Sequence, residues 1–175
     1  MSQVINAMPN VFFSQLVQSQ PKTDAQRMKF LPENLGGNFK ALMVFENAVY
    51  DSSDRIISGG NTPAYWEFAK TENSFFMYPG IEGGITADNH GNYSTKTVDG
   101  KTFGIIVSIM TFSNLSFAFY GRDDKLSSMF GEHYHNLRND FYSLVDELAY
   151  NDDAISKEEI EVIEAMSSAV YMLLD

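Results

Sequence analysis

The 175-residue sequence contains no cysteine and a single tryptophan. Without cysteine the chain has no disulfide, no thiolate nucleophile and no cysteine-based zinc site. The first residues lack the basic region that opens a signal peptide, and no uncharged apolar run of about 18 residues has the flanks of a membrane span. We therefore expect a cytoplasmic protein with no membrane partner.

Basic residues are also scarce, because Lys and Arg total 12 against 23 Asp and Glu, for a net charge of −11. The imbalance belongs to residues 122–175, which hold 13 acidic and 4 basic residues, whereas residues 1–121 hold 10 and 8. A field of this sign repels phosphate backbones and favours basic partners, so no specific nucleic-acid binding is expected. The acidic third is either a solvated helix surface, which is the commoner case, or a decoy for a DNA-binding groove.

Common catalytic and phosphate-binding motifs are missing as well. The sequence has no Gly-x-Ser-x-Gly nucleophile elbow. Gly100-Lys101-Thr102 resembles the end of a phosphate-binding loop, but position 95 is Thr where that motif needs Gly. The run 88–92 lacks the acidic spacing of a calcium loop and is typical of a turn. These motifs therefore assign no catalytic residue and no phosphate or calcium ligand.

The chain is long enough for one ordinary hydrophobic core, and nothing in it marks a second domain. Residues 1–22 are expected to be a loosely attached leader, with an apolar cluster that could form a short amphipathic helix before Pro21. Residues 23–175 are expected to form a single domain.

An aromatic β-hairpin is the clearest local feature. Residues 65–69 alternate as a half-buried strand does, residues 75–79 are largely aromatic, and the polar run 71–74 lies between them. Pro79 cannot donate to a strand ladder, so it should end the second arm. Trp66 is expected to serve in the core, which is commoner for such a hairpin than a ligand-stacking platform.

A second, more polar hairpin is predicted over 85–98, with Asn89–Asn92 as its turn. The apolar run 103–120 contains β-branched residues but is too long for a strand, so we interpret it as a buried helix capped by Asp99. Ser156 begins a capping box. Helical spacing of apolar residues predicts four helices, over 33–50, 101–118, 125–148 and 156–174. These elements predict an α+β fold, a small antiparallel sheet packed against several helices, with a helical C-terminal half.

Glu132 and His135 are the one local pair of side chains that could bind a metal ion together. They are three residues apart, so a helix would place them on one face, where a carboxylate and an imidazole can hold a divalent ion. A di-iron bundle would need a second Glu-x-x-His and further carboxylates, which the sequence lacks. We therefore interpret the pair as an exposed helix face and assign no metal ligand.

Three segments resemble the ArdB/KlcA antirestriction family, which is found on plasmids and other mobile genetic elements. Arg27 to Pro32 is similar to its Arg-x-x-Phe-Leu-Pro opening, and the aromatic hairpin is similar to its Tyr-Trp-x-Phe signature, although the Gly pair of the family's turn is missing. Residues 134–141 resemble its Tyr-His-x-Leu-Arg-Asp-Tyr run, with Asn139 departing from it. The signature residues are Phe30, Leu31, Pro32, Tyr65, Trp66, Phe68, Phe76 and Pro79.

The resemblance implies an antirestriction protein that counteracts type I restriction enzymes of the host. It also implies that the protein is not an enzyme, has no cofactor, and has the host type I restriction-modification machinery as its direct or indirect partner. Indirect interference with restriction is favoured over an acidic DNA mimic that binds the restriction enzyme directly, and a metal-dependent hydrolase is a further alternative.

The candidate interaction surface lies on the predicted helix 125–148. Arg138 is expected either to pair with a neighbouring carboxylate, Glu132 or Asp140, or to contact a partner. The residues of this surface are Glu132, His135, Asn136, Arg138 and Asp140.

Overall fold

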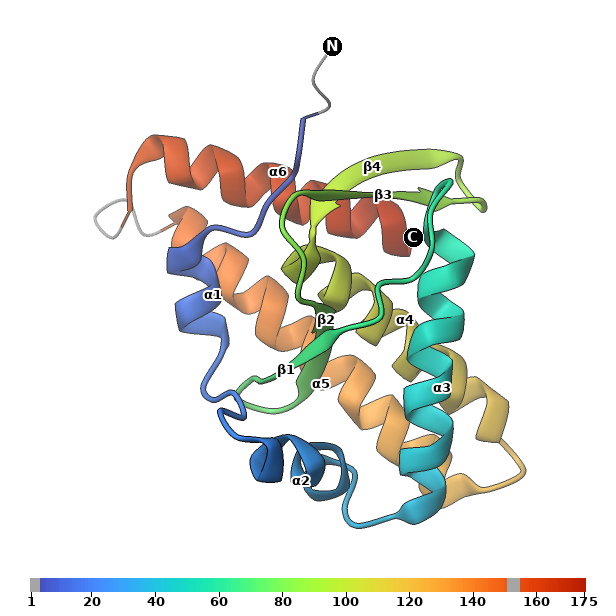
Figure 1. The fold of residues 1–175 in the computed structure, drawn as a ribbon. Helices are drawn as coiled ribbons and strands as arrows, with labels where there is room; N and C mark the ends of the chain where they lie inside the picture. The colour runs from blue at the N-terminus through green and yellow to red at the C-terminus, as the bar shows by residue number, and fades with distance from the viewer. Residues whose placement is uncertain (1–3, 151–154) are drawn as a thin grey trace.

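The computed structural model describes residues 4–150 and 155–175, in which the chain forms six helices and two β-hairpins (Figure 1). The predicted α+β class is confirmed, but the hairpins form two separate two-stranded antiparallel sheets and not one sheet. The helices are α1 (Asn10–Leu16), α2 (Asp24–Asn34), α3 (Phe39–Ile56), α4 (Gly100–Phe119), α5 (Asp124–Tyr150) and α6 (Lys157–Leu174). The strands are β1 (Trp66–Lys70), β2 (Phe75–Pro79), β3 (Gly84–Asn89) and β4 (Ser94–Asp99).

The apolar helix α4 lies at the centre of the fold. It packs against α5, β2, α3 and α6, so most of its circumference is covered. The predicted cap is confirmed, because the Asp99 side chain accepts a hydrogen bond from the backbone N–H of Thr102 at 3.0 Å. By length and composition α4 could cross a membrane, but 61% of its apolar window is buried inside the protein. Its hydrophobicity is therefore accounted for by its central position.

The aromatic hairpin packs directly on α4. All five residues of β2 are buried, and Gly104 of α4 faces them so closely that an added Cβ would lie 2.2 Å from the Tyr78 Cβ. The Ser108 hydroxyl accepts from the Met77 N–H at 3.1 Å and lies 3.3 Å from the Met77 carbonyl oxygen. Trp66 is only 3% exposed and its indole N–H donates to the Pro63 carbonyl. Its predicted place in the core is confirmed.

The predicted helix over 33–50 is wrong at both ends. Gly36 and Gly37 adopt left-handed backbone conformations, with φ of 63° and 67°, which end α2 and separate it from α3. The helix α3 then continues to Ile56, through the polar run 51–54, which by its composition should stop a helix. Two of the polar residues in that run, Ser52 and Ser53, are buried, and the Ser52 hydroxyl hydrogen-bonds Thr111 of α4. Tertiary partners therefore keep this polar segment helical.

The described part of the expected leader, residues 4–22, is not loosely attached. Phe12 is fully buried and its ring lies 5.3 Å from that of Phe141 on α5. Beyond α1 the backbone pairs with the end of β1, because Gln18 N–H donates to the Lys70 carbonyl and Lys70 N–H donates to the Ser19 carbonyl. Apolar side chains and backbone hydrogen bonds together dock this segment against α5 and the hairpin.

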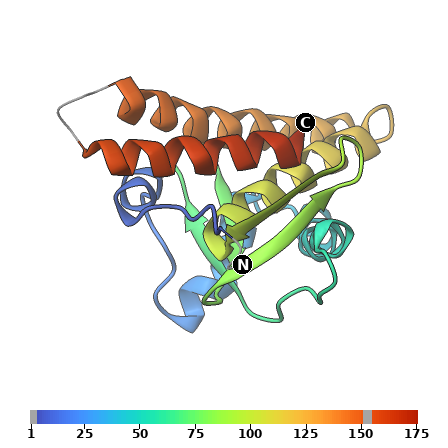
Figure 2. The same ribbon diagram turned by 90° about the horizontal axis from the view of Figure 1, so that it is seen from above.

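The two C-terminal helices run side by side and antiparallel, and the β3–β4 hairpin lies beside them (Figure 2). The predicted capping box is confirmed at the start of α6, where Ser156 and Glu159 exchange hydrogen bonds. The acidic run 151–153, where the sequence predicts a break between the last two helices, lies outside the described residues. At the other end of α6, Asn92 donates to the Met172 carbonyl at 2.8 Å, which joins the β3–β4 turn to the helix.

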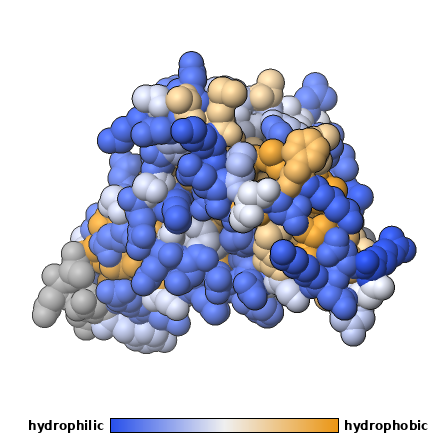
Figure 3. Space-filling view, turned by 90° about the horizontal axis from the view of Figure 1, so that it is seen from below, coloured by the Kyte–Doolittle hydropathy of each residue, from blue (hydrophilic) through white to orange (hydrophobic). Residues whose placement is uncertain are grey.

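The face of the molecule seen from below is mostly hydrophilic, with some hydrophobic patches (Figure 3). Two exposed apolar side chains, Phe39 and Met43, lie one turn apart at the beginning of α3. Helix α3 lies on the opposite side of the molecule from α1 (Figure 1).

Candidate interaction site on helix α5

Helix α5 presents polar residues on two different sides. Successive residues of a helix are rotated by about 100° around its axis, so residues two apart point in nearly opposite directions. Asn136 and Asp140, one turn apart, face the turn of the β1–β2 hairpin. Arg138 lies two residues from Asp140, which places it on nearly the opposite side of the helix. The structure therefore separates the predicted surface into two parts.

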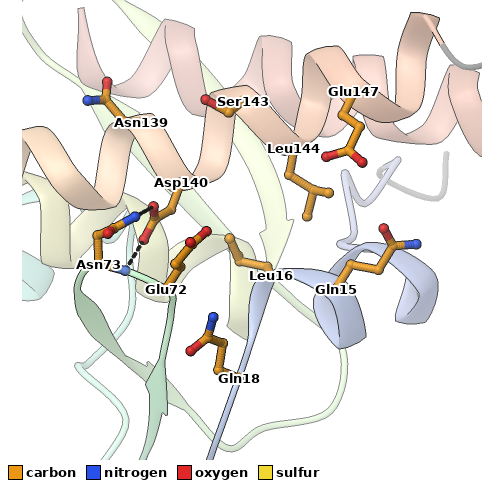
Figure 4. A pocket seen from close by; sticks show the side chains of 10 residues that line it. All are labelled: Gln15, Leu16, Gln18, Glu72, Asn73, Asn139, Asp140, Ser143, Leu144 and Glu147. Atoms are coloured by element: carbon orange, nitrogen blue, oxygen red, sulfur yellow. Dashed lines mark hydrogen bonds between the residues drawn. The ribbon is translucent and has the colours of Figure 1, made fainter.

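Asp140 holds the hairpin turn through three hydrogen bonds, of which Figure 4 draws the two to Asn73. Its carboxylate accepts from the Thr71 hydroxyl at 2.6 Å, from the Asn73 backbone N–H at 2.9 Å and from the Asn73 side-chain amide at 2.7 Å. Asn136 adds a fourth bond by donating to the Asn73 carbonyl at 3.2 Å. We call these four residues the turn clamp. The turn clamp fixes the hairpin against α5 although 67 residues separate Asn73 from Asp140.

His133 connects the same turn to α2 from a half-buried position. Its Nδ1 lies 2.9 Å from the Ser74 hydroxyl and its Nε2 lies 3.1 Å from the Asn34 carbonyl oxygen. A neutral ring satisfies both bonds, since Nε2–H can donate to the carbonyl while Nδ1 accepts from the hydroxyl. Burial against the Phe112 and Phe75 rings lowers the pKa of His133 below its usual value, against smaller raising effects from the Asn34 carbonyl and from Glu132. The residue therefore serves as a neutral connector.

Arg138 does not pair with Glu132 or Asp140, so that prediction is wrong. Its guanidinium lies 5.6 Å from the ring centroids of both Tyr134 and Tyr142, one turn before and after it on α5. It also hydrogen-bonds the Tyr134 hydroxyl at 3.2 Å and lies 3.9 Å from the Asp175 carboxylate. The helical spacing explains this outcome. Tyr134 and Tyr142 are each four residues from Arg138 and share its face of the helix, whereas Asp140 is two residues away and lies on another face.

Glu132 and His135 both project from the exposed surface of α5, as the sequence predicted. Within residues 4–150 and 155–175, no group of three or more His, Cys, Asp or Glu side chains is arranged to hold a metal ion. The two residues thus contribute polar surface beside the turn clamp.

A polar cleft of about 300 Å³ opens beside the turn clamp, between α1, the hairpin turn and α5 (Figure 4). Its walls carry the carboxylates of Glu72, Asp140 and Glu147, and its lining includes no basic side chain. Leu16 and Leu144 give it a small apolar floor. The cleft is consequently suited to a polar or basic group and unsuited to an anion.

A family model described as Antirestriction protein matches residues 61–149, just over half of the chain. The chain belongs to the antirestriction protein family. The matched range begins before β1 and contains both hairpins, α4 and nearly all of α5, so it includes every residue of the turn clamp. The resemblance predicted from the aromatic hairpin and from residues 134–141 is thereby confirmed.

A solved structure of the KlcA and ArdB proteins has a similar fold. The TM-score is 0.64 and the sequence identity 23%, over 87% of this antirestriction chain and 91% of the other. Those proteins are described as showing a novel fold and antirestriction activity against Type I DNA restriction systems in vivo but not in vitro. A comparison with curated protein sequences gave no match.

Four residues of the site in this antirestriction protein were not predicted from its sequence: Thr71, Asn73, Ser74 and His133. Residues 133, 136 and 140 do follow a helical spacing, which is a signal that one face of α5 is polar where it meets another element. Their partners lie more than 55 residues away along the chain, at the hairpin turn. No local pattern links the two segments.

Proposed function

We propose that this protein is an antirestriction protein of a mobile genetic element such as a plasmid, which counteracts type I restriction in the host cytoplasm. We further propose that it acts as an inhibitor and not as an enzyme, through indirect interference with restriction. Family membership supports the general activity. The observation that carries the finer proposal is the fold shared with KlcA and ArdB, whose activity is described as present in vivo and absent in vitro.

At least three of the 23 acidic side chains are engaged within the fold, which weighs against DNA mimicry. A DNA mimic needs free carboxylates at regular spacing along an extended face, because duplex DNA carries one charge per roughly 1.7 Å of its axis. Here the Asp140 carboxylate accepts hydrogen bonds within the turn clamp. The Asp123 carboxylate forms an ion pair with Lys40, and the Glu67 carboxylate forms one with Arg27. These carboxylates are therefore engaged within the fold and contribute less to any imitation of a phosphate row.

The exposed part of α5 is our candidate contact surface with the host machinery. Glu132 and His135 are exposed on this helix, while Asn136 and Asp140 shape the surface by holding the turn. Arg138 supports the opposite side through its tyrosine contacts. On this proposal the surface contributes to antirestriction without being catalytic.

The test is phage plating on a host with a type I system, scoring cleavage and methylation of the phage DNA separately. The wild-type protein should restore plating and leave methylation intact. Loss of both activities would instead favour the DNA mimic, and unchanged restriction would refute the proposed function. Inhibition of a purified type I enzyme in vitro would likewise favour direct binding.

The surface is tested in the same assay with the double variant Glu132→Ala/His135→Ala. A matched control is Glu161→Ala/His90→Ala, which removes the same two exposed side-chain types elsewhere. We expect protection to fall at least about tenfold for the first variant only. Equal protection by both would remove this part of α5 from the function. A metal assay on protein purified without chelator tests the hydrolase alternative, which stoichiometric metal would support.

A further inference from the structure

A second groove lies between α5 and α6, on a different side of α5 from the turn clamp. Its volume is about 420 Å³, and its lining includes Tyr142 and Tyr150 from α5 and Tyr171 from α6. Ser167 and Ser168 leave room between these rings, because their side chains are small. The two helices pack antiparallel, as Figure 2 shows, and both contribute to the lining of the groove.

Two of the three tyrosines that line this groove are unusually available for contact. Tyr150 and Tyr171 are 85% and 58% exposed, although large aromatic side chains are usually buried. The Tyr142 hydroxyl is shielded from solvent and has no hydrogen-bond partner among the described residues. Burying an unpaired hydroxyl is unfavourable. Because the Tyr142 hydroxyl is closed to a ligand, Tyr150 and Tyr171 supply the aromatic faces that a ligand can contact.

The charge of the groove is negative. Asp146 and Glu164, one on each helix, line it, and its lining includes no basic side chain. Neither carboxylate forms an ion pair within the part of the chain that the structure describes. Arg138 lies over the Tyr142 ring, 5.6 Å from its centroid, and is also engaged by Tyr134 and Asp175. The groove consequently combines aromatic faces with two free carboxylates.

We propose that the groove between α5 and α6 is a docking surface for an arginine-bearing basic segment of a partner protein. A guanidinium stacks on tyrosine faces and makes paired hydrogen bonds with a carboxylate, so it matches both features of the lining. The acidic C-terminal third supplies a long-range field that attracts such a segment and repels nucleic acid. The docking does not depend on the proposed antirestriction mechanism, because the groove lies apart from the turn clamp.

The proposal is tested by fluorescence anisotropy with a labelled hexa-arginine peptide, at about 0.15 M salt, where weak surface attraction is largely screened. The groove variant is Glu164→Gln/Tyr171→Ser. The matched control is Glu161→Gln/Tyr120→Ser, which removes one exposed charge of α6 and one exposed tyrosine outside the groove. We expect the groove variant to bind about tenfold more weakly and the control to stay within about twofold, since one ion pair and one cation–π contact are lost.

Equal weakening by the two variants would show diffuse electrostatic attraction and overturn the proposal. Equally tight binding of a hexalysine peptide would overturn the part played by arginine, because lysine lacks the planar stacking group. Circular dichroism confirms that each variant is folded. If Tyr171→Ser unfolds the protein, Tyr150→Ser replaces it, because that side chain is almost fully exposed. Plating assays with the same variants report antirestriction separately, so loss of peptide binding with full protection would leave the proposed function intact.

Discussion

The turn clamp leads to a quantitative prediction for Asp140→Ala. The substitution removes three hydrogen bonds to a carboxylate, and each such bond contributes roughly 1.5–3 kcal/mol in a buried site. The full sum does not apply, because the carboxylate is half-buried and the three bonds share one acceptor group. The Thr71 hydroxyl, on a fully buried residue, would also lose its acceptor. We therefore expect the free energy of unfolding to fall by about 2–4 kcal/mol.

Urea denaturation followed by circular dichroism measures this loss. Asp140→Asn keeps the shape and one acceptor oxygen, so it should lose about half as much stability. Asn139→Ala is the control, because Asn139 is the exposed neighbour of Asp140 on α5 and should change stability by less than about 0.5 kcal/mol. A double-mutant cycle with Thr71→Val should give a coupling of about 1 kcal/mol or more. If Asp140→Ala matched Asn139→Ala, the turn clamp would not stabilise the fold.

Three further perturbations test the packing of the core and the titration of His133. Trp66→Ala should lower the free energy of unfolding by about 3–5 kcal/mol, whereas Tyr65→Ala, on a half-exposed neighbour, should cost less than about 1 kcal/mol; an unchanged denaturation midpoint with lost activity would make Trp66 a contact residue. Gly104→Ala should cost at least about 2 kcal/mol by thermal melting, because its Cβ would overlap Tyr78, and a wild-type melting temperature would contradict the close packing. Because burial lowers the pKa of His133 in the folded state, the unfolded chain binds the proton more readily and stability falls as the pH drops below about 6.5. The loss has a limiting slope of about 1.4 kcal/mol per pH unit, and urea titrations between about pH 5 and 7 should show it in the wild type and not in His133→Gln.

Short sequence patterns were sufficient to predict the helices, caps and strands that depend on residues close together in the chain. The apolar stripes of α5 and α6 repeat every three to four residues, and the caps at Asp99 and Ser156 lie within the same turn as the N–H groups they accept from. The aromatic hairpin likewise depends on strand alternation and a polar turn within 15 residues. The family resemblance came from short segments of the same kind, and the match to residues 61–149 confirms it.

The predictions that failed concerned contacts between distant segments. The packing of Phe12 against Phe141 attaches residues 4–22 to the core. The hydrogen bond between Ser52 and Thr111 explains why α3 continues through a polar run. Neither partner is within reach of a local pattern, because packing brings together residues more than 50 positions apart. A hydrophobic stripe predicts which face of a helix is buried, but it does not predict which other element packs on that face.

The sequence by itself determined the family, the α+β class, the acidic C-terminal third and the exposed position of Glu132 and His135. The tertiary structure alone decided what the other polar residues of α5 do. Asp140 and Arg138 are two residues apart, yet one holds the hairpin turn while the other lies between two tyrosines near Asp175. Helix geometry requires them to face different ways, but only the packing of the hairpin, α4 and α6 around α5 supplies a partner for each.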